Sequence, residues 1–191
     1  MVQNDFAVVP GFVVSADVLR QFLDTLKSSE ALVADLPDSS LHLDVDNWRQ
    51  LQQVAISLRQ EMMSATLPHL WVSEILKAVR ELSADSLIFR SSLTINSRTR
   101  KLGNISGLLE SQVSSCSEAD ISLALKSTWS QLFRARSLLY WQRFGFDIRK
   151  IRSAVLVQPL RKVIASGELV ANSSIFEIKA NLGIGNCNQK R

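Results

Sequence analysis

One arginine, with a few hydroxyl and glycine residues, makes up the most informative chemistry in this sequence. The run Leu87–Ser92 starts apolar and ends in Arg90 followed by two serines. The segment Gly107–Ser111 then brings a glycine, a carboxylate and another hydroxyl. A guanidinium can form two hydrogen bonds to a phosphate, and a glycine lets backbone N–H groups approach the same anion closely. These residue types therefore indicate a site for a polyphosphate.

Hydrophobic periodicity predicts the elements that must hold these groups in place. In the first half of the chain, apolar residues recur at helical spacing over 15–28, 46–62 and 70–82. A short β-type run, Val8–Val14, precedes these helices, and 29–45 is mixed sequence that contains a loop. The first half is therefore predicted to be mainly helical.

The second half is predicted to contain the sheet. A helix starts at the N-cap Ser117, which is followed by acids in the first turn, and runs to Gly145. A loop is expected over 94–104, and strands are expected over 87–92, 105–113, 154–160, 168–171 and 175–180. This order predicts an α+β fold: a helical N-terminal half, then a mainly antiparallel sheet with one long helix.

Composition narrows the class of protein. The chain has 191 residues, of which 46% are hydrophobic and 21% charged, as in ordinary globular domains. Its net charge is +4, but the basic residues are scattered among acidic ones. This scattered pattern does not favour nucleic-acid binding. No apolar run is long enough to span a bilayer, and the start of the chain does not read as a secretory signal. Cys116 and Cys187 lack metal-type spacing, so reduced thiols in a cytoplasmic protein are expected.

Five segments occur in the order seen in one nucleotide-binding family. They are Val9–Ser15, Phe89–Ser92, Ser106–Ser111, Trp129–Tyr140 and Val155–Gln158, the last with Ala165-Ser-Gly167 after it. In these segments the sequence resembles the N-terminal, ATP-grasp-type ATP-binding domain of phosphoenolpyruvate synthase and pyruvate phosphate dikinase. Rifampicin phosphotransferases and glucan water dikinases also carry this domain. The resemblance covers nearly the whole chain and implies an incomplete ATP-grasp-like domain with a nucleotide as ligand.

The resemblance implies a role for four residues. Arg90 would bind the ATP phosphates, Gly107 would let the backbone approach them, and Ser111 would donate a hydroxyl nearby. Gln158 would bind the edge of the adenine. The residues themselves leave a structural alternative open for three of these positions. Arg90 could form a structural salt bridge, Gly107 could mark a β-bulge, and Gln158 could be a solvated amide at a strand end.

Other residues with reactive side chains read as structural. Arg136 shares a helical face with apolar residues, so its charged end is expected to reach past them into solvent. Glu110 lies in the same segment as Gly107 but is expected to be an exposed surface acid. His42 and His69 lie in the helical half in no arrangement typical of a catalytic triad.

The sequence also departs from the family in ways that bear on catalysis. The family has a Gly-Gly-Lys segment upstream of Val9, whose lysine contacts ATP. The dikinases carry acids after Arg-Ser-Ser, where this chain reads Leu93–Arg98. Beyond Leu182–Gly185 the family continues into a lobe that supplies magnesium-binding carboxylates and a catalytic arginine. Because phosphoryl transfer depends on metal ions and cations, we expect a truncated or divergent domain that is not catalytic alone.

These expectations define two functions from different classes. In the first, the chain binds ATP, and Mg²⁺ joins only if the missing lobe is supplied, for example by a second polypeptide. The ancestral reaction would be ATP-dependent phosphotransfer to a carrier histidine. In the alternative, the chain is a non-catalytic interaction or scaffold module that retains the fold. The predicted parts are 1–86 (helical), 87–185 (sheet-containing, ATP-binding) and 186–191 (polar tail).

Overall fold

The computed structural model describes residues 8–26, 48–95, 107–146, 148, 151–171 and 176–183. The chain forms two compact units, residues 1–159 and residues 160–191, and each is described by itself. The loop predicted over 29–45 and most of the loop over 94–104 lie outside the described residues. His42 and Cys187 lie outside them as well.

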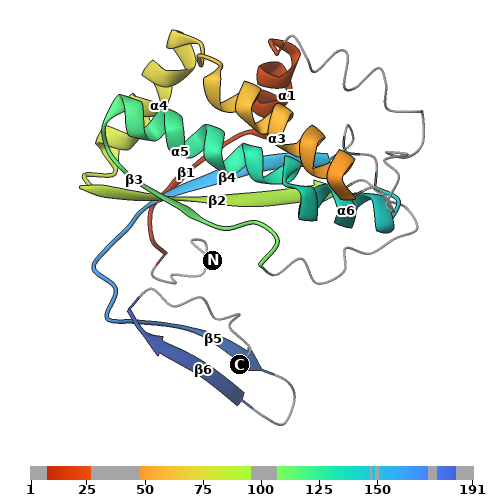
Figure 1. The fold of residues 1–191 in the computed structure, drawn as a ribbon. Coiled ribbons are helices and arrows are strands. Elements are labelled where there is room, and N and C mark those ends of the chain that lie inside the picture. The colour runs from red at the N-terminus through yellow and green to blue at the C-terminus, as the bar shows by residue number, and fades with distance from the viewer. Residues whose placement is uncertain are drawn as a thin grey trace. The chain divides into compact units, whose positions relative to one another are not determined.

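A four-stranded antiparallel sheet forms the centre of the first unit (Figure 1). Its strand order is β1–β4–β2–β3, with bounds Phe12–Val14 (β1), Ser86–Ile95 (β2), Gln112–Ser115 (β3) and Ile151–Pro159 (β4). The predicted α+β fold is confirmed, and β2 and β4 confirm the strands predicted over 87–92 and 154–160. The early run before the first helix also joins the sheet, because β1 pairs with β4.

The prediction of one continuous helix over 117–145 is wrong. The structure has α5 (Glu118–Ser130), a 3-10 turn η2 (Gln131–Phe133) and α6 (Ala135–Arg143) in its place. Arg134 separates them with an extended backbone, φ −65° and ψ 146°. The predicted N-cap is confirmed, because the Ser117 hydroxyl accepts a hydrogen bond from the N–H of Asp120 at 3.1 Å.

Side chains from α6 compensate the helix break. Ser137 Oγ donates to the carbonyl of Gln131 at 2.7 Å, and Trp141 Nε1 donates to the carbonyl of Leu132 at 2.9 Å. All four residues are buried. Carbonyls left without a helical partner must find another one when they are buried. Hydrogen bonds from α6 to the turn η2 therefore stabilise the break. Hydrophobic periodicity alone does not predict these bonds.

The strand predicted over 105–113 is also wrong for most of its length. Residues 107–111 form a turn and an irregular segment, and β3 starts only at Gln112. Gly107 has a φ of 76°, a conformation that residues with a Cβ rarely adopt. In the described part of this region the chain therefore turns before it enters the sheet.

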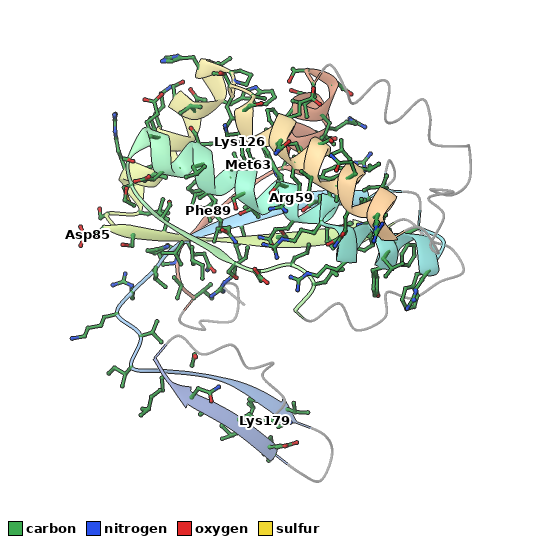
Figure 2. All side chains as sticks on the ribbon, viewed as in Figure 1. Arg59, Met63, Asp85, Phe89, Lys126 and Lys179 are labelled. Atoms are coloured by element: carbon green, nitrogen blue, oxygen red, sulfur yellow. The ribbon has the colours of Figure 1, made fainter. Side chains whose placement is uncertain are left out.

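The helices lie on one face of the sheet (Figure 1). Besides α5 and α6, they are α1 (Ala16–Asp24), α3 (Trp48–Ser64) and α4 (His69–Glu81), which confirm the three predicted helical segments. α1 packs on β4, and α5 packs on β2, β3 and β4, while α3 and α4 pack on α5. Lys126 of α5 fixes the end of α3 by donating to the carbonyls of Met63 and Ala65 at 2.7 and 2.8 Å (Figure 2).

The helix-covered face of the sheet carries the core. Phe89 of β2 and Val155 and Val157 of β4 are completely buried, as is Trp129 of α5. The ring of Trp129 packs against that of Phe22 of α1 with centroids 5.4 Å apart. Alternate residues of β2 and β4 thus join the sheet to the helix layer.

The second unit contains a β-hairpin, β5 (Ala165–Ala171) with β6 (Phe176–Leu182). These strands confirm the two predicted over 168–171 and 175–180. Leu169 pairs with Ile178, so these two residues and every second residue from them along each strand lie on one face of the hairpin. This set comprises Ala165, Gly167, Leu169, Ala171, Phe176, Ile178, Ala180 and Leu182. The opposite face carries Glu177 and Lys179, which form an ion pair of 3.2 Å.

Among the helices that the structure describes, none is long and apolar enough to cross a membrane.

Candidate functional site

The face of the sheet opposite the helices carries polar and basic side chains. No helix of the first unit packs on it in the described part of the chain (Figure 1). The side chains that alternation directs to this face are those of Val13, Ser86, Ile88, Arg90, Ser92, Thr94, Val113, Ser115, Arg152, Ala154, Leu156 and Gln158. Ile88 is buried, and the others are exposed or half-buried. This set, called the open face below, holds two arginines and no acid.

Arg90 and Gln158 meet on the open face. Their backbones lie on neighbouring strands, where Arg90 pairs with Leu156 and Ile88 pairs with Gln158. Arg90 Nη1 donates to Gln158 Oε1 at 3.4 Å, and Gln158 Nε2 donates to the carbonyl of Val9 at 3.2 Å. The structure therefore brings together two residues that the sequence analysis singled out, although 68 positions separate them.

Gly11 allows the segment before β1 to approach the same place. A Cβ at this position would lie 2.6 Å from the carbonyl oxygen of Val157 and 2.8 Å from Cγ of Gln158. Such distances are shorter than any normal contact, so a side chain would push this segment away from β4. Gly11, which follows Pro10, thus lets the segment before β1 lie close to Gln158 of β4.

Ser111 and Gly107 lie on the segment that enters the sheet next to β2. The last pair of the β2–β3 register is Phe89 with Gln112. If this antiparallel register is continued by one residue, Ser111 lies opposite Arg90. Ser111 and Gly107 are both exposed. Arg90 and Gln158 thus lie on neighbouring strands, and Ser111 lies just before the strand that pairs with the other side of β2. Gly107 lies at the far end of the same segment.

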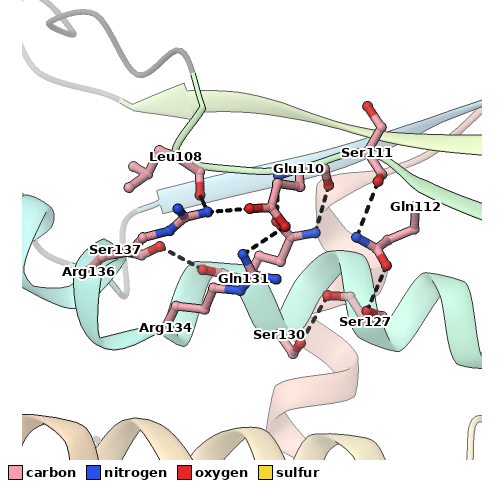
Figure 3. A network of polar contacts seen from close by, with 10 residues as sticks. All are labelled: Leu108, Glu110, Ser111, Gln112, Ser127, Ser130, Gln131, Arg134, Arg136 and Ser137. Atoms are coloured by element: carbon pink, nitrogen blue, oxygen red, sulfur yellow. Dashed lines mark hydrogen bonds and ion pairs between the residues drawn. The ribbon is translucent and has the colours of Figure 1, made fainter. Parts of the chain in front are cut away.

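Glu110 is exposed, as the sequence suggested, and two arginines bind it (Figure 3). Its carboxylate oxygens lie 3.0 Å from Arg134 Nη1 and 2.9 Å from Arg136 Nη2. The hydrogen bond from Arg134, reinforced by that from Arg136, lowers the pKa of the Glu110 carboxyl although partial burial opposes this. Arg136 also donates to the carbonyl of Leu108 at 3.1 Å, which agrees with the structural role expected for it.

Gln131 completes this network, and the sequence analysis missed it. Its amide group accepts a hydrogen bond from the N–H of Glu110 and donates to the carbonyl of Glu110 at 2.6 Å. Gln131 is completely buried. The available signal was an amide between Trp129 and the apolar pair Leu132 and Phe133. We call Glu110, Gln131, Arg134 and Arg136 the loop clamp, because they hold residues 107–111 against η2 and α6 (Figure 3).

The described residues offer no metal-binding cluster and one thiol. Among them, no three His, Cys, Asp or Glu side chains are grouped so that they could hold a metal ion. Cys116 is a free thiol whose Sγ donates to the carbonyl of Ala84, and burial raises its pKa. His69 is exposed at the start of α4. The described polar groups on and beside the open face are guanidinium, hydroxyl, amide and backbone groups.

The fold and this face define an α+β domain with a sheet that is helix-covered on one side and basic on the other. The chain belongs to the family "Pyruvate phosphate dikinase, AMP/ATP-binding domain", whose model matches residues 1–178. This confirms the family suggested by the five sequence segments.

Similar proteins include two enzymes of archaea and bacteria. The chain is 24% identical to the phosphoenolpyruvate synthase of Pyrococcus furiosus over 225 residues, which is 97% of this chain and 27% of that protein. It is 25% identical to the rifampicin phosphotransferase of Streptomyces sviceus over 185 residues, which is 93% of this chain and 21% of that protein. The chain therefore spans about a quarter of the length of these relatives.

Proposed function

We propose that this chain binds ATP on the open face of its four-stranded sheet. In this proposal Arg90 binds the phosphates, the backbone at Gly107 and the Ser111 hydroxyl contact the same groups, and Gln158 binds the adenine edge. The observation that carries the proposal is the contact between Arg90 and Gln158 on a face without acids. Membership of an AMP/ATP-binding family supports the same ligand.

The charge of Arg90 is available for an anion. Within the described part of the chain Arg90 forms no ion pair, and its 3.4 Å bond to Gln158 is at the long end of the hydrogen-bond range. A phosphate that replaces this bond therefore costs the protein little and gains a charge-assisted pair. Arg152 on the same face is paired with Asp17 at 3.9 Å, which partly neutralises its charge, so Arg90 is the cation that this proposal assigns to the phosphates.

Apolar side chains next to this pair suit a base. Leu156 lies opposite Arg90, and Ile88 lies opposite Gln158, so each polar residue has an apolar residue opposite it and the two polar residues are diagonal to each other. An adenine lying on the half-buried Leu156 would have its edge within reach of the Gln158 amide. The phosphates would then extend toward Arg90 and Ser111.

Catalysis is proposed to need more than these residues. The described part of the chain groups no carboxylates for Mg²⁺, which the transfer of a phosphoryl group requires. We propose that Mg²⁺ and the ATP-dependent phosphotransfer to a carrier histidine depend on a further lobe, supplied by a second polypeptide. A cytoplasmic location, where ATP is abundant, belongs to the same proposal.

Thermal unfolding with and without nucleotide tests this function. ATP at a hundred times its dissociation constant should raise the free energy of unfolding by about 2.7 kcal/mol. Because the phosphates provide most of the contacts, AMP should give a smaller shift and adenosine the smallest. Mg²⁺ alone is the control. The same midpoint with and without millimolar ATP would contradict the proposal.

A second candidate function, an interaction module, rests on the β5–β6 hairpin. Its apolar face is exposed, with Phe176 at 76% and Ile178 at 72% of full exposure. A two-stranded ribbon of this kind needs a packing partner for stability. The proposed partner is a polypeptide that completes the family's domain. Binding of such a polypeptide, encoded beside this chain, should be abolished by Ile178→Glu and retained by Lys179→Glu on the opposite face.

A further inference from the structure

The loop clamp holds the backbone of residues 107–111 in a way that a strand neighbour would. Both ends of the Gln131 amide bind the main chain of Glu110, one as acceptor and one as donor. This pattern is what a paired strand residue offers in an antiparallel ladder. Gln131 is completely buried, and its own carbonyl is fixed by Ser137 Oγ. The side chain of Gln131 thus takes the place of a neighbouring strand just before the chain enters β3.

Arg136 fixes a second point of the same segment. A single nitrogen, Nη2, donates both to the carbonyl of Leu108 at 3.1 Å and to the carboxylate of Glu110 at 2.9 Å. Arg134 binds the other oxygen of this carboxylate at 3.0 Å. The segment is therefore tied at Leu108 and at Glu110, on the side that faces η2 and α6 (Figure 3).

The attachment at Leu108 and Glu110 sets the direction of the backbone N–H groups of the residues that follow each of them. In a trans peptide group, the C=O of one residue and the N–H of the next residue point in opposite directions. With Leu108 and Glu110 bound to the helices, the N–H groups of Leu109 and Ser111 are directed away from them. No described residue binds either N–H group. Free backbone N–H groups beside a glycine with positive φ are what an anion-binding concavity offers.

We propose that Gln131, Glu110 and Arg136 are positioning residues that present the N–H groups of Leu109 and Ser111 to the nucleotide phosphates. The inference rests on the proposed function, because the ligand is the same ATP. It adds three residues that touch no ligand themselves. The carboxylate of Glu110 serves the loop and is not a metal ligand or a general base.

Conservative variants of two neighbouring arginines test the positioning role. Arg136→Lys keeps the charge but cannot bridge Leu108 and Glu110 with the same geometry. Its matched control is Arg134→Lys, because Arg134 binds only the carboxylate. We expect Arg136→Lys to weaken ATP binding about tenfold and Arg134→Lys less than about twofold, measured by calorimetric titration. Gln131→Glu is a second test, since it removes the donor to the Glu110 carbonyl.

Amide hydrogen exchange without nucleotide separates positioning from a loss of folding. Faster exchange confined to residues 108–111 in Arg136→Lys, with weaker ATP binding and an unchanged unfolding midpoint, is the expected result. If the wild-type chain binds ATP and both Arg136→Lys and Gln131→Glu bind it equally well, the clamp has no positioning role. If the wild-type chain binds no ATP, the proposed function fails, and this inference fails with it.

Discussion

On the side of β2 that the helices cover, Phe89 is completely buried, whereas on the other side its neighbour Arg90 is exposed. The same alternation continues on β4, where Val157 is buried and Gln158 is only half-buried. The two faces are built from the same strands, yet one supplies the core and the other the candidate site. This separation means that stability and ligand binding should respond to different substitutions on consecutive residues.

The largest effect is expected from the core face. Phe89→Ala should lower the free energy of unfolding by about 3–5 kcal/mol, because it removes a buried ring and leaves a cavity. Thr94→Ala on the open face of the same strand is the control and should stay within about 0.5 kcal/mol. Urea denaturation followed by tryptophan fluorescence measures both. Equal losses for the two variants would break the distinction between the faces.

The next effect concerns binding and not stability. Arg90→Met should weaken ATP binding by about 1.5–3 kcal/mol, as expected for a hydrogen bond to a charged group. Its unfolding free energy should change by less than about 0.5 kcal/mol, because the side chain is exposed. Arg80→Met on α4 makes the same change of net charge far from the open face. Equal losses of ATP affinity in both variants would show that general charge, and not this site, attracts the nucleotide.

A smaller effect belongs to the helix layer alone. Ser117→Ala removes the hydroxyl that accepts from Asp120 N, and should lower the unfolding free energy by about 1 kcal/mol. ATP affinity should remain as in the wild type. Ser122→Ala within α5 is the matched control and should not destabilise, since alanine favours helix. A change in ATP affinity for Ser117→Ala would mean that the two faces are coupled.

The smallest effect is the pH dependence of the loop clamp. The folded-state pKa of Glu110 lies below its ordinary value of 4.5 because Arg134 and Arg136 bind the carboxylate. The stabilisation is therefore fully present well above pH 4.5 and is lost as the pH falls through the folded-state value. Solvent screens this half-exposed group, so we expect less than about 1 kcal/mol.

Comparing the wild type with Glu110→Gln from pH 7 to pH 3 measures this contribution. The difference in unfolding free energy should be constant at neutral pH and should shrink in acid. A difference that grows as the pH falls would have the wrong sign for the clamp.

The sequence predicted the regular elements well where one pattern governed them. Periodicity was sufficient for α1, α3, α4 and the strands β2 and β4, because their apolar residues all face one layer. It failed at 105–113 and at the break in the predicted helix, and both failures involve Gln131. A buried amide that binds the backbone of Glu110 is a tertiary interaction, so local propensity contains no trace of it.

The candidate site was predictable in its residue types but not in its geometry. The five family segments pointed to Arg90 and Gln158, and only the register of β2 with β4 shows that they touch. The role of Gly11 also follows from that register, since a Cβ there would collide with Val157. The clamp residues Glu110 and Arg136 were noticed in the sequence, but not their pairing.

Titrating ATP into the ¹⁵N-labelled chain and following its backbone amide signals shows where on the molecule the nucleotide binds. If the open face binds the nucleotide, titration should shift the amide signals of Arg90, Ser111 and Gln158, while those of Val72 and Val79 on α4 stay in place. Shifts confined to the helices or to the β5–β6 hairpin, or no shifts at millimolar ATP, would contradict the account.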